Sequence, residues 1–463
     1  MHDFTLPQEL ISLIQSVRDA GGRALLVGGA VRDQLRRQPV TQDFDIEVYG
    51  LKAQPLKTIL RSAGKVLEVG KTFGIFNLQT ASGVYDFCLP RLETKTGFGH
   101  KNFQITTDPD LQYQKAAYRR DFTVNTIGFD PLTGQYLDPF FGREDLRRGI
   151  LRHVGTSFGE DPLRVLRAVQ FSGRFRFRVA PETVRVCRGM NLSELPKERI
   201  FEEFRKLLLR APYPSIGLET ARTLGVLDYF PELKSLIAVP QNPHPDTDLW
   251  IHTLRVIDAA ASLKQEKITS ALTLMLSALC LEFGTPLAMI RRDQTWSRLP
   301  HTESSSSLTQ NFLKRLTDEK KLIQEVDALV REQHQPLQLY QGRSRFKPSA
   351  VRRLALRVPI QMLVRLARAK HLGKLYYKTK TKEFPEGDWL LKQAELFSVA
   401  EGPPKPILMG RDILKRGMRP GPRMGILLEK AFEAQLNGEF QSFQEAQCWI
   451  EKQLSEEPVP TEG

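Results

Sequence analysis

Two short groups of residues near the amino terminus have the types and spacing that phosphate chemistry requires. Gly28 and Gly29 are followed by Arg32, and Asp43 is separated from Asp45 by one residue. Glycines let the backbone turn tightly and approach a ligand, and an arginine can donate two parallel hydrogen bonds to phosphate oxygens. On a strand, residues i and i+2 share a face, so the two carboxylates repel each other unless a cation lies between them. Hard oxygen ligands beside a phosphate suit Mg²⁺, so the groups predict metal-dependent nucleotidyl transfer.

The local pattern predicts the elements that position these groups. The apolar run 24–27 predicts a strand, and a helix is expected to begin at Ala30, so that free N–H groups face a triphosphate. Alternation over 44–49 predicts a second strand, and 84–89 predicts a third that carries Asp86. That carboxylate could accept the proton of an attacking hydroxyl or complete a metal shell. Each pattern alone is also compatible with an ordinary turn or a solvated strand face.

A charged cluster follows at Arg119-Arg120-Asp121. Adjacent arginines can hold phosphate while the acid fixes their orientation. Asn125 lies four residues further on and could bond a ribose hydroxyl. Taken alone, the cluster is equally compatible with a charged turn before a buried strand.

A helix is predicted to begin at Pro162, because Glu160 and Asp161 suit a helix amino terminus. Asp161 and Arg164 are three residues apart and share a face. Such a pair offers an acceptor and a fork of donors, which matches the Watson–Crick edge of cytosine or adenine without a template. The alternative is an ordinary capped helix with an ion pair.

Composition limits the class of protein. The chain has 463 residues, 41% of them hydrophobic, which predicts three or four domains or subdomains. Its net charge of +14 favours a polyanionic partner. The four cysteines form no Cys-x-x-Cys pair, which argues against a zinc ribbon or a disulfide framework. The run 271–283 is too short to span a bilayer and predicts a buried helix, so we expect a soluble cytoplasmic protein without membrane association.

The order of patterns along the chain predicts an α+β protein. An amphipathic helix is expected over 7–20, and short strands alternate with turns over 24–150. The polar segment 91–117 contains two glycines and predicts a long mobile loop. From residue 162 to the end the pattern is helical, apart from a serine-rich loop expected over 292–310.

Considered together, the motifs resemble the class II tRNA nucleotidyltransferase (CCA-adding enzyme) and bacterial poly(A) polymerase family, over roughly residues 24–235. The motifs, in chain order, are Gly28-Gly29-x-x-Arg32-Asp33, Asp43-Phe44-Asp45, Arg119-Arg120-Asp121-x-x-x-Asn125 and Glu160-Asp161-x-x-Arg164, with Glu198-Arg199 resembling a later Glu-Arg pair. The resemblance implies a polymerase β-type nucleotidyltransferase head with a mixed sheet and helices, followed by all-α domains. These would be the head over 1–150, a base-reading neck over 151–235, a body over 236–340 and a tRNA-binding tail over 341–463.

The resemblance also implies roles for individual residues. Asp43 and Asp45 would bind Mg²⁺, Gly29 and Arg32 would contact the triphosphate, Arg120 and Arg167 would contact the nucleotide, and Asp161 and Arg164 would recognise CTP and ATP. Gly28 and Asn125 join this nucleotide-binding group, and Asp86 joins the catalytic pair, from the patterns described above. Gln170 stands where several members of the family carry an arginine.

Residues 244–254 resemble the opening of the HD phosphohydrolase module that some members of the family carry. The His-Asp pair of that module would fall at Leu281-Glu282. Leucine cannot ligate a metal, and a site that lacks one ligand has neither the number of ligands nor the coordination geometry that the metal requires. The resemblance therefore predicts a degenerate, inactive HD-like body.

The resulting expectation is a Mg²⁺-dependent enzyme that adds CCA to the tRNA 3′ end from CTP and ATP. It would hold the acceptor stem and elbow of tRNA, and no protein partner is expected. Poly(A) polymerase, a CC-adding or A-adding enzyme, and an HD-type phosphohydrolase remain as alternatives. The segment 91–117 resembles the flexible element associated with the switch to A addition, which favours full CCA addition.

Overall fold

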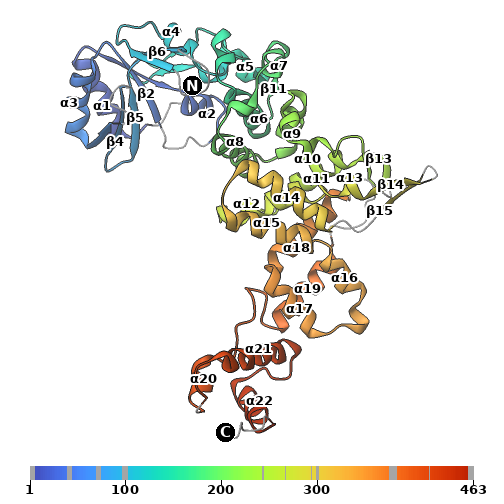
Figure 1. The fold of residues 1–463 in the computed structure, drawn as a ribbon. Helices are drawn as coiled ribbons and strands as arrows, with labels where there is room; N and C mark the ends of the chain where they lie inside the picture. Colours follow the sequence, from blue (N-terminus) through green and yellow to red (C-terminus); the bar gives the residue numbers. More distant parts are fainter. Residues whose placement is uncertain are drawn as a thin grey trace. The chain divides into compact units, whose positions relative to one another are not determined.

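The chain forms two compact units, residues 1–231 and 232–463, and each contains a hydrophobic core of its own (Figure 1). The computed structural model describes residues 6–38, 44–68, 74–95, 103–241, 244–265, 267–292, 295–298, 302–374, 383–416 and 418–456. The predicted α+β class is confirmed, because a mixed sheet lies in the first unit and helices dominate the second.

A seven-stranded sheet organises the first part of the chain, in the order β3-β4-β5-β2-β1-β8-β9. Strands β2 and β5 run parallel, whereas the other neighbours run antiparallel. The strands are β1 Arg23–Val27, β2 Phe44–Tyr49, β3 Lys65–Glu68, β4 Ile75–Gln79, β5 Val84–Cys88, β8 Gly128–Asp130 and β9 Gln135–Leu137.

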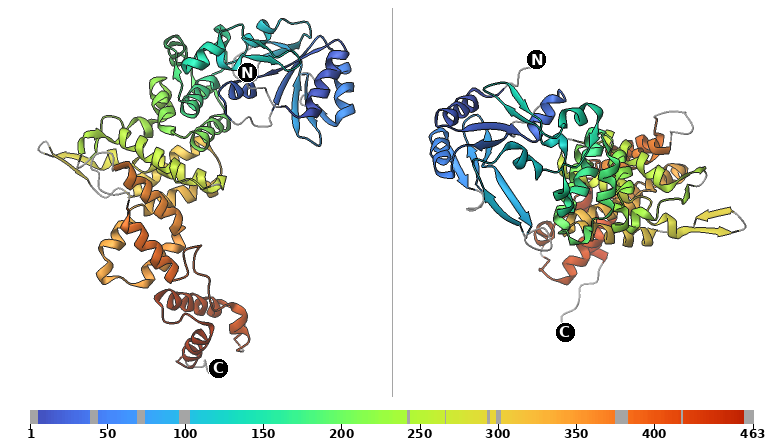
Figure 2. Two further views of the ribbon diagram at one scale, coloured as in Figure 1. Left: turned by 180° about the vertical axis from the view of Figure 1, so that it is seen from behind. Right: turned by 90° about the horizontal axis from the view of Figure 1, so that it is seen from above.

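Helices cover one face of this sheet (Figures 1 and 2). The helices packed with the sheet core are α1 Gln8–Asp19, α2 Gly29–Leu35 and α3 Ala53–Ala63. Phe44, Ile46 and Val48 of β2 belong to that core. Because successive strand residues point to opposite faces, Asp45 and Glu47 lie on the other face of the sheet.

Most elements expected in this part are confirmed. The strands predicted at 24–27, 44–49 and 84–89 are β1, β2 and β5, and the helix predicted over 7–20 is α1. Helix α2 begins at Gly29, one residue before the expected Ala30. Asp43 lies outside the described residues.

The loop predicted over 91–117 is wrong. Strands β6 Arg91–Lys95 and β7 Phe103–Thr107 form an antiparallel hairpin, and α4 Tyr113–Tyr118 follows. Ile105, Thr106 and Thr107 are β-branched and favour an extended backbone despite the polar composition of the segment. In the sequence, the two glycines between the strands favour a loop more strongly than the residues of the strands favour an extended backbone.

Helices, 3₁₀ turns and a short parallel pair of strands complete the first unit, and helices α6, α8 and α9 pack closely together. The remaining elements are the helices α5 Gly142–Arg148, α6 Leu163–Phe175, α7 Pro181–Arg188, α8 Lys197–Arg210 and α9 Pro214–Thr223, the 3₁₀ turns η1 Thr123–Asn125, η2 Thr156–Glu160, η3 Leu192–Glu194 and η4 Val226–Tyr229, and the parallel pair β10 Ile150–Leu151 and β11 Arg178–Val179. Pro162 precedes α6, as predicted. A Cβ atom at Gly173 or Gly217 would come within 2.5 Å of Leu207, so glycine allows α6, α8 and α9 to approach each other.

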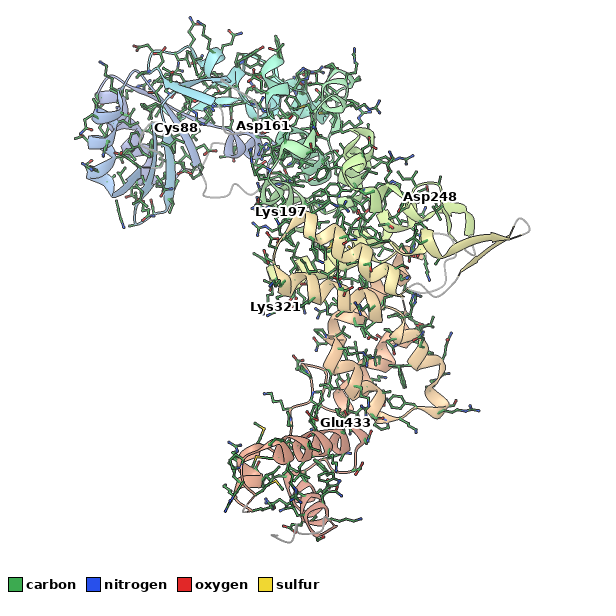
Figure 3. The ribbon with its side chains drawn as sticks, viewed as in Figure 1. Cys88, Asp161, Lys197, Asp248, Lys321 and Glu433 are labelled. Atoms are coloured by element: carbon green, nitrogen blue, oxygen red, sulfur yellow. The ribbon has the colours of Figure 1, made fainter. Side chains whose placement is uncertain are left out.

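The second unit is helical apart from two short hairpins, β12 Pro240–Gln241 with β13 His244–Asp248 and β14 Met289–Arg292 with β15 Thr295–Arg298. Asp248 lies at the amino terminus of α11 (Figure 3), where its carboxylate accepts a hydrogen bond from the Ile251 N–H. The helices are α10 Pro231–Lys234, α11 Leu249–Ser262, α12 Ile268–Cys280, α13 Thr285–Ala288, α14 Thr302–Leu316, α15 Lys320–Glu332, α16 Gln335–Gln341, α17 Pro348–Arg357, α18 Ile360–Lys374, α19 Pro385–Leu396, α20 Gly410–Leu414, α21 Pro422–Asn437 and α22 Phe443–Glu456.

The serine-rich loop predicted over 292–310 is also wrong, because residues 295–298 belong to β15 and residues 302–310 to α14. Ser305, Ser306 and Thr309 are buried there, and Arg331 of α15 donates a hydrogen bond to Ser306 Oγ at 2.6 Å. Packing against α15 therefore overrides the weak helix propensity of serine.

The apolar stretch Ile268–Ala288 is long and apolar enough to cross a membrane by composition. However, 89% of its most apolar window is buried inside the protein. The stretch contains α12 and agrees with the buried helix predicted over 271–283.

Candidate active site

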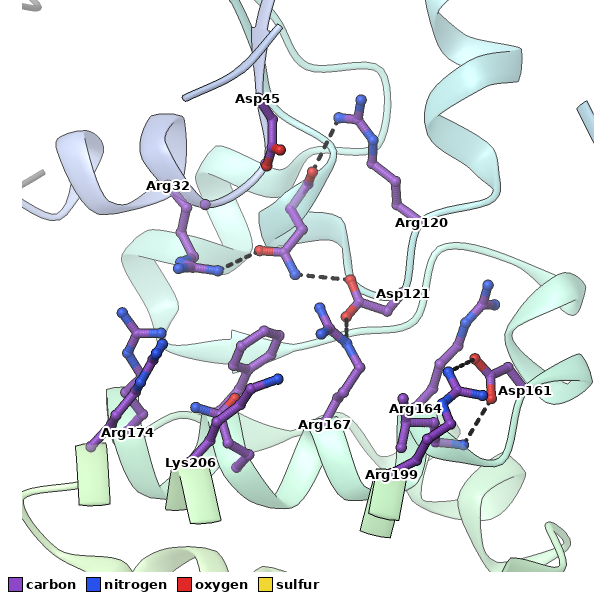
Figure 4. Close-up of a pocket in the computed structure, with 17 residues that line it drawn as sticks. Arg32, Asp45, Arg120, Asp121, Asp161, Arg164, Arg167, Arg174, Arg199 and Lys206 are labelled. Atoms are coloured by element: carbon purple, nitrogen blue, oxygen red, sulfur yellow. Dashed lines mark hydrogen bonds and ion pairs between the residues drawn. The ribbon is translucent and has the colours of Figure 1, made fainter. Parts of the chain in front are cut away.

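A pocket of about 500 Å³ opens in the first unit, where side chains from α2, β2, α6 and α8 converge (Figure 4). Most of the residues predicted from the sequence line it. They are Gly28, Gly29, Arg32, Asp45, Arg120, Asn125, Asp161, Arg164 and Arg167.

The two described members of the predicted carboxylate group lie on neighbouring strands. The parallel pairing of β2 with β5 places Asp45 directly opposite Asp86, although Asp86 is not part of the pocket lining. Asn77, the next residue in register on β4, donates a hydrogen bond from Nδ2 to Asp86 Oδ1 at 2.8 Å. Sheet register therefore brings together two carboxylates that are 41 positions apart in the sequence.

These two carboxylates are suitable ligands for a divalent cation. Asp45 is exposed and Asp86 is half-buried, so both can reach a bound ion. Oxygen ligands of this kind match the preference of Mg²⁺. Within the described part of the chain, which omits Asp43, no group of three or more His, Cys, Asp or Glu residues is arranged to hold a metal.

The turn between β1 and α2 lies close to Asp45. Gly28 has a φ of +72°, a conformation that favours glycine. A Cβ atom at this position would lie 3.3 Å from Asp45 Oδ2. Glycine at position 28 therefore serves both the turn and the approach of the backbone to the carboxylate.

Arg32 is held in place by two neighbours. Its Nε and Nη2 donate to the two oxygens of Asp33 at 2.8 and 3.0 Å, and its Nη1 donates to Asn125 Oδ1 at 2.7 Å. Asn125 Nδ2 in turn donates to Asp121 Oδ1 at 2.8 Å. Asn125 was predicted as a ribose contact, and in this structure its amide links Arg32 to Asp121.

Arg120 is oriented by a residue that the sequence did not single out. Arg120 Nη2 donates to Glu47 Oε2 at 2.9 Å, and Arg119 Nη2 lies 3.5 Å from Glu47 Oε1. The expectation that Asp121 orients these arginines is therefore wrong. Glu47 is fully buried and also accepts a hydrogen bond from Tyr49. Its place two residues after Asp45, on the same strand face, is the signal that could have identified it.

Electrostatic interactions keep Arg120 charged. Burial alone lowers the pKa of Arg120, but the nearby Tyr113 hydroxyl and the Glu47 carboxylate outweigh burial, so that the pKa is raised overall. Burial also raises the pKa of Tyr113, to about 12, so its hydroxyl keeps its proton. The guanidinium is therefore a fixed positive charge in the pocket wall.

Asp121 positions Arg167 instead. Arg167 Nε donates to Asp121 Oδ2 at 2.6 Å. Burial raises the pKa of Asp121, but the Arg167 charge and the hydrogen bonds from Asn125 and Phe122 outweigh burial. The pKa is therefore lowered overall. Asp121 is therefore an ionised carboxylate, and it fixes Arg167 on the pocket-facing side of α6.

The pair expected to read the base lies at one end of the pocket, with separate partners. Asp161 accepts a hydrogen bond from the Leu163 N–H at 3.0 Å and lies 3.5 Å from Arg199 of α8. Arg164 donates to the backbone carbonyls of Ser157 and Arg119, at 2.7 and 2.8 Å. Figure 4 shows Asp161, Arg164 and Arg199 grouped together, so an acceptor and two guanidiniums lie within reach of one ligand.

Positive charge dominates the pocket lining. Eight arginine or lysine side chains and three aspartates contribute to it. Three of the cations, Arg174, Lys206 and Arg210, were not predicted, although they recur at helical spacing on α6 and α8. The excess of positive charge is suited to an anionic ligand.

A buried lysine lies beside Glu282, at the place where the metal-binding His-Asp pair of an HD module would fall. His252 and Glu282 are both buried, and His252 Nε2 lies 3.7 Å from Glu282 Oε1. Lys370 Nζ lies 3.0 Å from the same oxygen and donates to Gln333 Oε1 at 2.5 Å. Burial lowers the pKa of His252 to about 4, so its ring is neutral near pH 7.

Comparison with known families gives two matches, the first within the first unit and the second ending just beyond it. Residues 24–152 match the family described as poly A polymerase head domain. Residues 176–237 match the family described as the probable RNA and SrmB-binding site of polymerase A. The pocket is built from residues of the first match together with α6 and α8.

Relatives of known name cover more of the chain. A multifunctional CCA protein of Nitrosococcus oceani is 41% identical over 249 residues, which are 52% of this chain and 59% of the relative. A multifunctional CCA protein of Xylella fastidiosa is 36% identical over 308 residues, which are 64% of this chain and 70% of the relative.

Solved structures share the fold over nearly the whole chain. The CCA-adding enzyme of Bacillus stearothermophilus in complex with CTP gives a TM-score of 0.65 at 22% identity, covering 97% of this chain and 99% of that one. The Thermotoga maritima CCA-adding enzyme complexed with tRNA gives a TM-score of 0.58 at 20% identity, covering 97% and 96%.

Proposed function

Because this chain belongs to the class II tRNA nucleotidyltransferase and bacterial poly(A) polymerase family, we propose that it adds CCA to the 3′ end of tRNA from CTP and ATP without a nucleic-acid template. One observation carries the proposal: a single cationic pocket is lined by Asp161 and Arg164, whose groups match a base edge, and by the exposed carboxylate of Asp45. The names of the relatives and the ligands of the solved neighbours, CTP and tRNA, support the same activity.

In the proposed reaction, the tRNA 3′-hydroxyl oxygen attacks the α-phosphorus of the nucleotide. A bond from O3′ to phosphorus forms, the bond from the α-phosphorus to the bridging oxygen breaks, and pyrophosphate leaves with that electron pair. Asp86, beside Asp45 on the adjacent strand, accepts the hydroxyl proton. Arg32, Arg120 and Arg167 neutralise the phosphates while their buried partners hold them still.

We propose that Asp43 and Asp45 hold Mg²⁺. When bound, the ion would lower the pKa of the attacking hydroxyl and stabilise charge on the phosphates. The exposed carboxylate of Asp45 at the pocket wall supports this assignment.

Base choice would depend on Asp161, Arg164 and Arg199. A carboxylate accepts from an exocyclic amino group and guanidiniums donate to ring nitrogens or oxygens, a pattern that cytosine and adenine both satisfy. We further propose that the helices after residue 235 hold the acceptor stem and elbow of tRNA, and that the enzyme acts in the cytoplasm. The division into a head, neck, body and tail is part of this proposal.

The alternatives differ in their products. A poly(A) polymerase would use the same head, and a CC-adding or A-adding enzyme would use the same pocket. An HD-type phosphohydrolase is disfavoured because Lys370 supplies a positive charge beside His252 and Glu282. Leucine at position 281 removes a further ligand.

Incorporation assays test the proposal directly. Labelled CTP and ATP would be offered with Mg²⁺ to three tRNA transcripts that end before CCA, after C and after CC. We expect ordered addition of C, C and A that then stops. Open-ended A tails would instead indicate a poly(A) polymerase, and activity on only some transcripts would indicate a split enzyme.

Asp45→Asn should abolish incorporation while leaving CTP binding in place, because it removes a negative charge at the reacting phosphate without removing the cationic pocket. Asp19→Asn, which changes an exposed carboxylate on α1, provides the matched control. Equal activity of the two variants would contradict the role of Asp45.

A further inference from the structure

A second cavity, of about 390 Å³, lies wholly within the second unit and has no part in the mechanism above. Its walls come from the beginnings of three helices, α12, α15 and α18. Lys321 of α15, which is labelled in Figure 3, is one of the lining residues. We call this cavity the three-helix pocket. Its size lies within the range of about 300–1,000 Å³ that is usual for small-molecule sites.

Part of the lining of the three-helix pocket is apolar. Leu272 of α12 and Leu322 and Leu329 of α15 are buried, and Met362 of α18 is half-buried in the same lining. A methionine side chain is flexible and adapts to ligands of different shape. Covering such a surface removes apolar area from water, so the pocket favours a ligand with an apolar body.

An arginine without a counter-charge lines the same cavity. Arg365 is half-buried and lies one turn after Gln361 and Met362 on α18. Among the residues that the structure describes, none forms an ion pair or a side-chain hydrogen bond with Arg365. By contrast, Arg368 on the same helix pairs with Asp388. A guanidinium that is partly removed from water without a partner is unfavourable, so Arg365 is a ready binding group for an anion.

The two carboxylates of the three-helix pocket do not supply that partner. Glu325 accepts a hydrogen bond from Thr273 at 3.1 Å and lies 4.0 Å from Lys321, and Glu319 is exposed. With the arginine and Lys267, the lining contains three cations and two carboxylates, a net charge of +1 (three minus two). A ligand with a single negative charge would balance this excess.

We propose that the three-helix pocket binds a small organic monoanion, a carboxylate with an aromatic or branched aliphatic body. The carboxylate would accept the two parallel hydrogen bonds that the Arg365 guanidinium can donate. The apolar body would lie against the buried leucines. An RNA backbone fits this pocket less well, because its repeated negative charges would meet Glu319 and Glu325. The proposal concerns the second unit alone and does not depend on nucleotidyl transfer.

Methyl NMR of the full-length protein tests the proposal. The chain has eight methionines, and ¹³C labelling of their methyl groups gives a signal from Met362 that the Met362→Leu variant identifies. The probes are naphthoate, its neutral analogue naphthamide, and acetate, which has the charge without the apolar body. Naphthoate should shift the Met362 signal with a Kd on the order of 1 mM, as expected for a ligand of this size. Naphthamide and acetate should each bind at least about tenfold more weakly.

Two variants separate the effect of charge from that of shape. Arg365→Gln should weaken naphthoate binding about tenfold and leave naphthamide binding unchanged, because only the carboxylate loses its partner. Ser270→Leu fills part of the pocket, leaves every charge in place and should abolish binding of both probes. Arg368→Gln is the matched control, since Arg368 lies on the same helix but is not a lining residue. It should bind naphthoate as the wild type does.

Three results would overturn the inference. The first is a Met362 signal that shows no saturable shift up to about 10 mM naphthoate. The second is equal naphthoate affinity in the wild type and Arg365→Gln. In the third, tRNA lacking CCA would shift the Met362 signal of the wild type but not that of Arg365→Gln, while neither protein bound naphthoate, which would assign the arginine to RNA. Failure of the proposed function is distinguishable, because these titrations contain no nucleotide and do not measure incorporation.

Discussion

At the scale of single residues, the site consists of charged groups held in place by buried partners. Glu47 shows this most clearly, because its fully buried carboxylate faces Arg119 and Arg120 together. Asp121 does the same for Arg167, and Asn125 for Arg32. Such fixed charges need no reorganisation when a phosphate arrives, which is what electrostatic stabilisation of a transition state requires.

Glu47→Gln should impair catalysis although Glu47 touches no substrate. The change keeps the size of the side chain but removes the charge that holds two guanidiniums, so Arg120 would no longer be fixed. We expect kcat/KM for CTP to fall about tenfold or more, since hydrogen bonds to charged groups contribute about 1.5–3 kcal/mol. Steady-state kinetics with a melting curve for each variant measures this effect.

Glu144→Gln is the control for that comparison, because Glu144 pairs with Arg147 and Arg148 on the surface of α5. Its kinetics should match those of the wild type. Wild-type kcat/KM in Glu47→Gln would show that Arg120 does not need this carboxylate.

At the scale of elements, the backbone conformation of the β1–α2 turn brings Gly28 close to Asp45, the proposed catalytic carboxylate. Gly28→Ala introduces strain at φ +72° and places a Cβ atom 3.3 Å from Asp45 Oδ2. Gly134→Ala introduces similar strain at φ +70°, with no atom within 4 Å of the new Cβ. Both should lower stability by about 1–3 kcal/mol, the cost of a non-glycine residue in a sparsely populated backbone conformation. Only Gly28→Ala should also lose most CTP incorporation, and equal activity in the two variants would contradict a role for the turn.

The buried cluster in the second unit predicts a pH dependence of stability. The pKa of His252 is about 4 in the folded protein and 6.5 as its ordinary value. The unfolded state therefore binds a proton that the folded state does not, and stability falls as pH falls from 6.5 towards 4. At pH 5 the cost should be about 2 kcal/mol relative to pH 7, at 1.36 kcal/mol per pH unit below 6.5.

Urea unfolding at pH 7 and pH 5 measures this loss, with His252→Gln as the variant that lacks the titrating group. All four tryptophans lie in the second unit, so fluorescence excited at 295 nm reports its unfolding alone. The variant should lose less stability than the wild type between the two pH values. Identical losses would show that His252 does not titrate as its burial predicts.

The elements differ in how well sequence predicts them. Strand β1 was predictable because it is a short run of buried apolar residues, and β2 and β5 because apolar residues alternate along them. The β6–β7 hairpin was not predictable, because its polar residues do not indicate that the two strands pair. Helix α14 was not predictable either, because its serines do not indicate that it packs against α15. Glu47, Arg174 and Arg210 were missed because their importance depends on which side chains of distant segments lie beside them.

At the scale of the whole molecule, the net charge of +14 predicts that binding of tRNA depends steeply on salt. Neutralising even two phosphates lowers affinity about tenfold between 50 and 200 mM KCl, since log K falls by roughly 0.9 per phosphate for each tenfold increase in salt. Fluorescence anisotropy with labelled tRNA lacking CCA measures the slope. A slope near zero would argue that the excess of basic residues does not contact RNA.

The buried lysine of the second unit also limits which substitutions its surroundings tolerate. Lys370 contacts Glu282 and Gln333, so its ammonium and a neutral amide occupy the surroundings of His252. Reverting Leu281 to histidine alone would leave that positive charge in place, and removing Lys370 alone would leave Glu282 as a buried charge without its partner. Each single step is therefore unfavourable on its own. A metal centre at this place would therefore need coordinated substitutions at positions 281 and 370, because neither change alone removes the obstacle.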